Sequence, residues 1–214
     1  MSEILTRMAT AIIQGKREET GQLAQEALDS GLSVDDVLYK GLMPGMDHVS
    51  VEFKAGRMFV PEVMRSARSM LNAMEILKPI MAETGVRMVG KVLLGTVKGD
   101  LHDIGKNLVG MMCEGAGFEI KDIGTDTPPE AFVEAVKTFE PDVVGMSALL
   151  TTTMRVMGDV IKALEEAGVR DQLKIMVGGA PLSQAFADQI GADAYAPDAA
   201  AAAAKAAELV GKSR

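Results

Sequence analysis

The sequence lacks what a disulfide, a membrane span or a zinc cluster would need. Its 214 residues include one cysteine, Cys113, so no internal disulfide can form, which favours a reducing, cytoplasmic setting. No apolar run is long enough to cross a bilayer, and the first residues turn charged by Lys16, unlike a signal peptide. The two histidines, His48 and His102, do not combine with Cys113 into a plausible three- or four-ligand zinc cluster. We therefore expect a cytoplasmic protein with no membrane association.

Basic charge is also scarce. The chain carries 22 basic and 30 acidic side chains, a formal net charge of −8. Residues 1–88 hold 10 basic and 12 acidic side chains and show no basic stripe. This balance is a poor basis for nucleic-acid binding. A G-x-G-x-x-G motif is missing after the first predicted strand, which argues against a dinucleotide-binding enzyme.

The first 88 residues have helical periodicity. Apolar stripes begin at Leu5 and Leu23, and Ser33 with Asp36 forms a capping box that predicts a third helix. The segment "MPG" at 43–45 should interrupt or kink that helix. Pro61 stands in the first turn of a further helix that continues to about residue 77. We predict an N-terminal α-helical bundle of four or five helices as a domain spanning 1–88.

From residue 89 onward, strands alternate with helices. Apolar runs predict strands at 91–97, 118–124, 142–150, 173–179 and 192–196. Helices are expected between and after them, at 104–116, 128–140, 153–168, 182–190 and 198–211. This alternation predicts a Rossmann-type α/β domain over 89–214, with a five-stranded parallel sheet in the flavodoxin-like order 2-1-3-4-5. In that order, a ligand crevice lies at the carboxyl ends of strands 1 and 3.

One histidine falls at this expected crevice. His102 follows the first strand, and Asp100 could accept its second ring N–H, as carboxylates do beside metal-bound histidines. Gly99 and Gly105 leave room for a bulky group beside the backbone. A lone histidine is more often a surface or hydrogen-bonded structural residue, and that reading stays open here.

Two further features fall at the same predicted edge of the sheet. Ser147 and Leu149 close the third strand, and the segment Gly178–Ala180 closes the fourth. The glycines could simply serve a turn, and Ser147 with the threonines at 151–153 could cap the next helix. These separate readings do not explain why all three features share one edge. Together they indicate a slot for a long ligand with a polar tail.

The spacing of these residues resembles a known signature. Asp100-x-His102-x-x-Gly105 is followed after 41 residues by Ser147-x-Leu149, and after 28 more by Gly178-Gly179. This resembles the cobalamin-binding signature of cobalamin-dependent methionine synthase, and still more closely the stand-alone corrinoid proteins of anaerobic methyltransferase systems. The segment "FKAGRMFVPEVMRSARSM" resembles the cap segment of those proteins, so the resemblance covers essentially the whole chain.

The resemblance implies a bound cobalamin or related corrinoid in the base-off form, with His102 as the lower cobalt ligand. It also implies a relay from His102 through Asp100 to Thr153, which stands where methionine synthase has serine. The residues that it places against the corrinoid are Gly99, Asp100, Leu101, His102, Asp103, Ile104, Gly105, Ser147, Leu149, Thr151, Gly178, Gly179, Ala180 and Tyr195. It places Phe53, Val60 and Val63 over the methyl group, although all three could belong to the bundle core alone.

The function that the resemblance implies is methyl transfer. Co(I) would accept a methyl group from a substrate-specific methyltransferase and pass it on, as methyl-Co(III), to a second methyltransferase with tetrahydrofolate or a thiol as acceptor. A reductive activating protein would restore oxidised cobalt. Such carriers serve methylamines, betaines, methanol and aryl methyl ethers, because the partner methyltransferase selects the donor, and the carrier alone is not a complete enzyme. The alternative is a cobalamin-sensing regulator with an N-terminal DNA-binding part, which the acidic balance of 1–88 disfavours.

Overall fold

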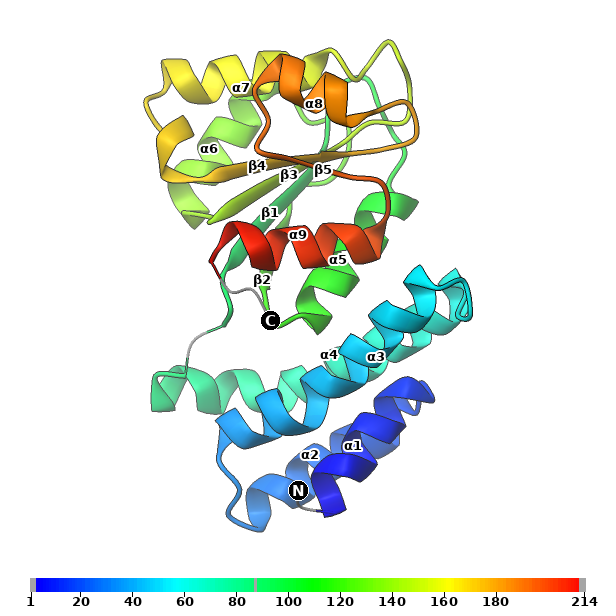
Figure 1. Cartoon of the computed structure of the whole chain (residues 1–214). Coiled ribbons are helices and arrows are strands. Elements are labelled where there is room, and N and C mark those ends of the chain that lie inside the picture. The colour runs from blue at the N-terminus through cyan, green and yellow to red at the C-terminus, as the bar shows by residue number, and fades with distance from the viewer. Residues whose placement is uncertain (1–2, 87, 212–214) are drawn as a thin grey trace. The chain divides into compact units, whose positions relative to one another are not determined.

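The computed structural model describes residues 3–86 and 88–211, which belong to two compact units (Figure 1). One unit comprises Met1–Met88 with Glu114–Gly117, and the other comprises Val89–Cys113 with Phe118–Arg214. The first is helical and the second contains a sheet, as the change of sequence pattern near residue 88 predicts.

The helical unit contains four α-helices and one π-helical segment within its described residues. These are α1 (Glu3–Ile13), α2 (Arg17–Asp29), η1 (Asp36–Leu42), α3 (Met43–Lys54) and α4 (Val60–Thr84). The expected capping bond is present, since the hydroxyl of Ser33 accepts the N–H of Asp36 at 3.1 Å. Helix α4 begins in a similar way, because the carboxylate of Glu62 accepts the N–H of Phe59 at 2.9 Å.

The "MPG" segment marks a change of helical form. The π-helical segment η1 ends at Leu42 and α3 begins at Met43, which places Pro44 in the first turn of α3. Proline has no N–H to donate and is tolerated in a first turn, so the chain stays helical through it. At the predicted interruption the helix therefore does not break but changes from π to α geometry.

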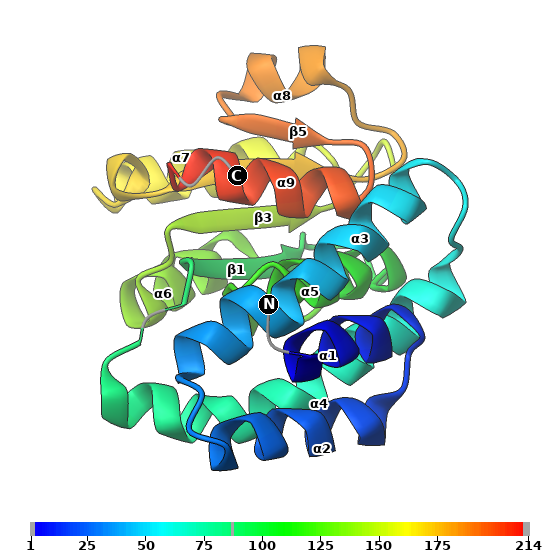
Figure 2. The ribbon, with the colours of Figure 1, turned by 60° about the horizontal axis from the view of Figure 1, so that its bottom comes forward.

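The second unit is a five-stranded sheet in which every strand pairing is parallel (Figures 1 and 2). The order is β2-β1-β3-β4-β5, as predicted. The strands are β1 (Lys91–Thr96), β2 (Glu119–Asp122), β3 (Val143–Ser147), β4 (Lys174–Gly178) and β5 (Ala194–Ala196). The α-helices are α5 (Ile104–Gly115), α6 (Pro129–Phe139), α7 (Val156–Glu166), α8 (Gln184–Ile190) and α9 (Ala199–Leu209), and a short 3-10 turn, η2, covers Arg170–Gln172.

The helices cover both faces of this sheet, with α6 and α7 on one face and α5 and α9 on the other (Figures 1 and 2). Leu93, Val144 and Ile175 are aligned across β1, β3 and β4 and are fully buried. They belong to a core cluster that includes Phe132 of α6 and Leu164 of α7. Burial on both faces explains why these strands are continuously apolar.

The register also aligns the ends of the three central strands. Thr96, Ser147 and Gly178 are the last residues of β1, β3 and β4, and they lie side by side. The segments that follow these strands therefore start from one edge of the sheet. This shared edge brings together residues that are far apart in the sequence.

The structure corrects the boundary expected after the third strand. The predicted strand 142–150 ends at Ser147, and the predicted helix 153–168 begins at Val156. A turn lies between them because the N–H of Leu149 donates to the carboxylate of Asp100 at 2.7 Å instead of to a neighbouring strand. Within residues 3–86 and 88–211, no helix has the length and apolar composition required to cross a membrane.

Close contact between α1 and α3 leads to a stability prediction. A Cβ atom at Gly45 would lie 2.9 Å from the carbonyl oxygen of Ala9 and 2.9 Å from Cβ of Ile12. We expect Gly45→Ala to lower the free energy of unfolding by about 1–3 kcal/mol, because the two helices must move apart. Gly158 of α7 is the control, since a Cβ there would meet nothing closer than 3.8 Å. Gly158→Ala should raise that free energy by up to about 1 kcal/mol in the same denaturant titration. Equal effects of the two substitutions would contradict this account.

Candidate functional site

The segment 97–103, here called the histidine loop, joins β1 to α5 at the shared edge of the sheet. Its start is held by two backbone bonds: Val97 donates to the carbonyl of Ser147 at 3.1 Å, and Asp100 donates to the carbonyl of Val97 at 3.1 Å. Its end is held by the hydroxyl of Thr96, which donates to the carbonyl of His102 at 3.0 Å. These bonds hold the loop against the carboxyl ends of β1 and β3.

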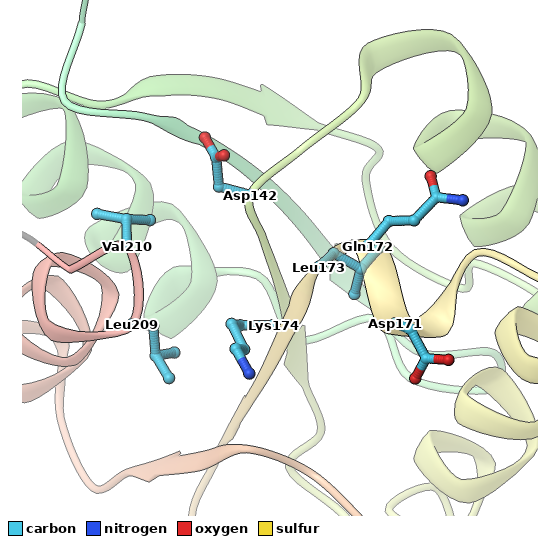
Figure 3. A pocket seen from close by; sticks show the side chains of 7 residues that line it. All are labelled: Asp142, Asp171, Gln172, Leu173, Lys174, Leu209 and Val210. Atoms are coloured by element: carbon cyan, nitrogen blue, oxygen red, sulfur yellow. The ribbon is translucent and has the colours of Figure 1, made fainter.

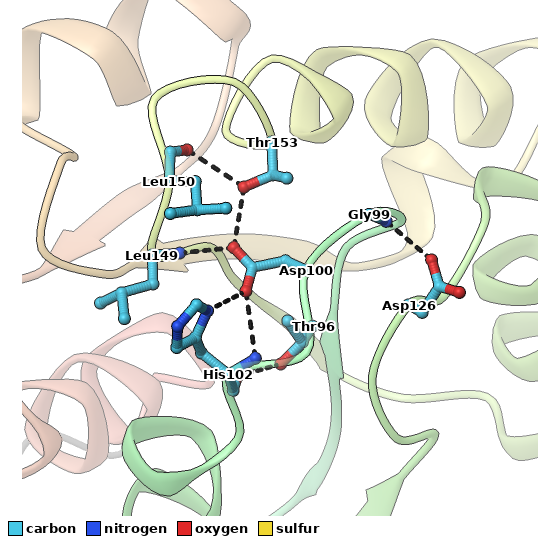
Figure 4. A network of polar contacts seen from close by, with 8 residues as sticks. All are labelled: Thr96, Gly99, Asp100, His102, Asp126, Leu149, Leu150 and Thr153. Atoms are coloured by element: carbon cyan, nitrogen blue, oxygen red, sulfur yellow. Dashed lines mark hydrogen bonds and ion pairs between the residues drawn. The ribbon is translucent and has the colours of Figure 1, made fainter.

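Asp100 is the centre of this loop (Figure 4). The side chain is completely buried, and its two oxygens accept four hydrogen bonds. One oxygen accepts the backbone N–H of His102 at 3.1 Å and faces the ring Nδ1 of the same residue at 2.6 Å. The other accepts the N–H of Leu149 and the hydroxyl of Thr153, both at 2.7 Å. The predicted contacts from Asp100 to His102 and Thr153 are thus present.

These contacts set the charge of Asp100. Burial by itself raises the pKa of its carboxyl group, but the hydrogen bonds from Leu149, His102 and Thr153 outweigh burial and hold the pKa well below its usual range. The residue is therefore an anion at neutral pH. Because a carboxylate can only accept, the bond to Nδ1 requires the proton on Nδ1 of His102.

The opposite ring nitrogen of His102 is presented to the outside. The side chain is 52% exposed, and Nε2 makes no hydrogen bond to any residue within 3–86 and 88–211. In the neutral form of the ring, the proton is on Nδ1 and Nε2 carries a lone pair. A neutral imidazole fixed by a carboxylate on its other nitrogen has the arrangement of a metal-ligating histidine.

Large apolar side chains accompany this ring. Leu101 and Ile104 are 74% and 77% exposed, and Leu149 and Leu150 are 42% and 43% exposed. A Cβ built at Gly105 would meet no atom within 4 Å, so the start of α5 is open as well. Clusters of exposed apolar residues mark binding sites, so this edge of the sheet is a candidate site for a ligand with a broad apolar surface.

The glycines at the end of β4 have a structural reason of their own. Gly179 has φ +135°, and a Cβ there would lie 1.8 Å from the carbonyl oxygen of Ala148. A Cβ at Gly178 would lie 3.0 Å from the carbonyl oxygen of Ala196. Glycine is thus required at position 179, and a side chain at 178 would be crowded, whatever ligand lies against this edge.

Two protein-family models, each described as a B12 binding domain, match this chain, one over residues 90–204 and the other over residues 4–78. The chain is 44% identical over 209 residues to dimethylamine corrinoid protein 1 of Methanosarcina acetivorans, with 97% of this chain and 98% of that protein covered. It is 42% identical over 212 residues to a corrinoid protein of Desulfitobacterium hafniense, with 98% of both covered. The chain belongs to the B12-binding corrinoid proteins.

A solved structure supports the same membership. The methanol:cobalamin methyltransferase complex MtaBC from Methanosarcina barkeri contains a chain that matches with a TM-score of 0.87 at 31% identity. The match covers 98% of the present chain and 80% of that one. The helical region followed by the parallel α/β sheet is thus the architecture of this corrinoid protein family.

The remaining residues predicted to contact the corrinoid differ in their exposure and in their hydrogen bonds. Thr151 and Ala180 are exposed at the same edge, and Tyr195 lies half-buried in β5. Asp103 accepts the backbone N–H of Asn107 at its carbonyl and the amide of that side chain at its carboxylate, at 2.8 Å and 3.0 Å. Asp103 therefore also has a structural role at the start of α5.

The three residues predicted over the methyl group belong to the helical unit. Val63 is fully buried, Phe53 is half-buried, and Val60 is 37% exposed. The burial of Val63 agrees with the alternative that it serves the bundle core. Phe59 was not among the residues predicted to lie over the methyl group, yet it precedes Val60 and its side chain is 66% exposed.

Two contacts of the histidine loop were missed from the sequence. Thr96 holds the carbonyl of His102, and Asp126 accepts the N–H of Gly99 at 2.7 Å (Figure 4). Thr96 reads as an ordinary strand residue, and Asp126 lies in a loop 27 residues away from Gly99. The contact of Thr96 depends on the path of the loop, and that of Asp126 depends on the position of β2 beside β1, so neither residue shows a signal in the sequence.

A pocket of about 240 Å³ lies away from this site (Figure 3). Asp142 precedes β3 and Lys174 begins β4, so the pocket lies at the amino ends of these strands, whereas His102 follows a carboxyl end. Its other lining residues are Asp171, Gln172, Leu173, Leu209 and Val210.

The buried hydroxyl of Thr153 provides a test of the Asp100 network. We expect Thr153→Val to lower the free energy of unfolding by about 2 kcal/mol, because it removes a hydrogen bond to a buried carboxylate while keeping the side-chain volume. Thr152 is exposed and adjacent, so Thr152→Val is the matched control and should change that free energy by less than about 0.5 kcal/mol. Urea titration of both variants measures the difference. A Thr153→Val protein as stable as the control would contradict the importance of this bond.

Proposed function

We propose that this chain binds cobalamin or a related corrinoid in the base-off form, with His102 as the lower axial ligand of cobalt. The observation that carries the proposal is the half-exposed imidazole whose Nδ1 is bonded to buried, ionised Asp100 and whose Nε2 makes no hydrogen bond to the described residues. The exposed apolar residues around it and the open space at Gly105 fit the face of a corrin ring.

The protein's own residues orient and protect the site. Asp100 fixes the tautomer of His102 and strengthens its basicity, and Thr153 holds Asp100 from behind. We propose Gly99, Leu101, Asp103, Ile104 and Leu149 as contacts near the ring. The proposed contacts along the tail are Ser147, Thr151, Gly178, Gly179, Ala180 and Tyr195.

We further propose that residues 1–88 form a cap domain and residues 89–214 the cobalamin-binding domain. In this proposal Phe53, Val60 and Val63 shield the methyl group. Because Val63 is fully buried, it could reach the group only after a rearrangement of its surroundings, whereas exposed Val60 could do so directly.

The proposed role is that of a methyl carrier between two enzymes. The corrin cobalt, when bound, supplies the nucleophile that accepts and releases the methyl group, and the protein supplies binding and electrostatics. A substrate-specific methyltransferase would load the carrier, and a second one would transfer the group to tetrahydrofolate or a thiol. A reductive activating protein would restore the cobalt, and all would act in the cytoplasm. The relatives support such a role, since one is named a dimethylamine corrinoid protein and the other is a chain of a methanol:cobalamin methyltransferase complex.

The two histidines allow a direct test of ligation. Protein labelled with ¹⁵N-histidine and loaded with hydroxocobalamin should show histidine nitrogen coupling in the electron paramagnetic resonance spectrum of its Co(II) form. His102→Ala should lose this coupling and bind the corrinoid about tenfold more weakly or worse, while the tail contacts retain some binding. His48→Ala should keep both properties, because His48 lies in α3. A spectrum with benzimidazole nitrogen on cobalt in the parent protein would contradict the proposal.

The carrier role predicts that methylation depends on a partner. Reduced, loaded protein mixed with free dimethylamine should keep its absorbance spectrum, because the described site offers a cobalt ligand and no second group to activate a donor. Addition of a dimethylamine:corrinoid methyltransferase should then produce the spectrum of the methylated corrinoid. Trimethylamine, methanol and betaine with their own methyltransferases serve as donor controls. Rapid methylation without any methyltransferase would refute the carrier role, and lack of methylation with every partner would favour a cobalamin sensor.

A further inference from the structure

The segment 122–126, which begins at the last residue of β2, contacts the histidine loop from a different part of the sequence. Asp126 makes two of these contacts. Its carboxylate accepts the N–H of Gly99 at 2.7 Å (Figure 4). Its own N–H donates to the carbonyl of Asp100 at 2.9 Å. Asp126 thus binds the loop at two successive residues, through the N–H of Gly99 and the carbonyl of Asp100.

The backbone of Asp126 is in an unfavourable conformation. Its φ is +53°, in the left-handed region that residues with a Cβ seldom adopt. Among the described residues, Glu140 is the one other non-glycine residue with positive φ, at +52°, and it ends helix α6, where that geometry is common. Asp126 does not end a helix. Such strain persists where surrounding contacts determine the conformation, and here the contacts are those to the histidine loop.

The other end of the same segment holds the residues that follow the loop. Asp122 forms an ion pair with Lys106, in the first turn of α5, and also accepts the N–H of Gly124 at 2.8 Å. The side chain of Lys106 is only 3% exposed and also donates to Asn107 at 2.9 Å. A buried cation at a helix N-terminus is opposed by the helix dipole and by desolvation, so this pair is better explained by positioning than by stability.

We propose that Asp126 is a positioning residue for His102, and that Asp122, through Lys106, anchors the start of α5 on the other side. The two carboxylates hold the chain at Gly99 and at Lys106, and the intervening residues carry Asp100 and His102. The half-exposed imidazole depends on its bond to Asp100, so a loop held at both ends keeps Nδ1 on that carboxylate. The part of this inference that concerns a cobalt ligand rests on the proposed function, and the part that concerns the loop does not.

Hydrogen exchange in the cofactor-free protein tests the loop. In Asp126→Ala we expect amides in the segment 99–103 to exchange about three- to tenfold faster, because one hydrogen bond to the loop is lost. Asp126→Asn should exchange like the parent, since asparagine tolerates positive φ and its side-chain oxygen can accept the same N–H. Asp126→Gly relieves the backbone strain without supplying an acceptor, so it should stay folded and exchange like Asp126→Ala.

Glu140 supplies the control, because Glu140→Ala retains the same unfavourable backbone geometry at a position that does not contact the loop. Its exchange in 99–103 should equal that of the parent. Equal exchange in the parent, Asp126→Ala and Asp126→Gly would overturn the inference. An equal increase in Glu140→Ala would also overturn it, since the effect would then reflect general destabilisation.

The loaded protein provides a second readout. With hydroxocobalamin, a smaller fraction of Co(II) in Asp126→Ala should show histidine nitrogen coupling, and Asp126→Asn should restore it. If the fraction of Co(II) with histidine nitrogen coupling is the same in Asp126→Ala as in the parent, Asp126 does not position His102 as a cobalt ligand. If the parent itself binds no corrinoid, the proposed function fails, while the exchange measurement still decides whether Asp126 positions the loop.

Discussion

The buried carboxylate of Asp100 is the interaction on which the site depends. A charged group without water is tolerated only when its oxygens are fully hydrogen-bonded, and here the donors come from two segments of the chain. The histidine loop supplies the N–H and the ring of His102, and the turn after β3 supplies Leu149 and Thr153. If either segment moved, an unpaired charge would be left inside the protein. The electrostatic requirement of one side chain therefore ties the two segments together.

Orientation of His102 follows from this arrangement. Because Asp100 stays ionised, it accepts a hydrogen bond from Nδ1–H of His102, and in the neutral ring Nε2 then carries the lone pair. Exposed leucine and isoleucine side chains lie close to His102 in the sequence or at the same sheet edge. The fold supplies the setting, since the parallel register aligns the ends of β1, β3 and β4. Residues that are about 50 positions apart, such as Asp100 and Thr153, thereby come within hydrogen-bonding distance. The site of this corrinoid protein is a product of strand alignment and a single buried charge.

Much of this could be predicted from the sequence, because the relevant signals are local. The change from helical to alternating periodicity near residue 88 predicts a bundle followed by a parallel sheet, and apolar strands of this length indicate burial on both faces. The spacing of Asp100, His102 and Gly105 is also local, as is the capping bond at Ser33. The end of the third strand could not be predicted, because Leu149 is apolar and continues the pattern. Its N–H leaves the sheet only because Asp100 is present to accept it.

The amino-acid sequence by itself determined the order of elements and the identity of the motif residues, since each depends on neighbours within a few positions. It also predicted the sheet topology, because five strands alternating with helices are typical of this strand order. Only the tertiary structure decided which distant groups satisfy Asp100, how far the imidazole is exposed, and that Asp126 and Asp122 hold the loop from another strand connection. It also decided that Gly179 is needed for contact with Ala148. These features depend on the alignment of parallel strands, and hydrogen bonds between separate strand ends leave no periodic trace in the sequence.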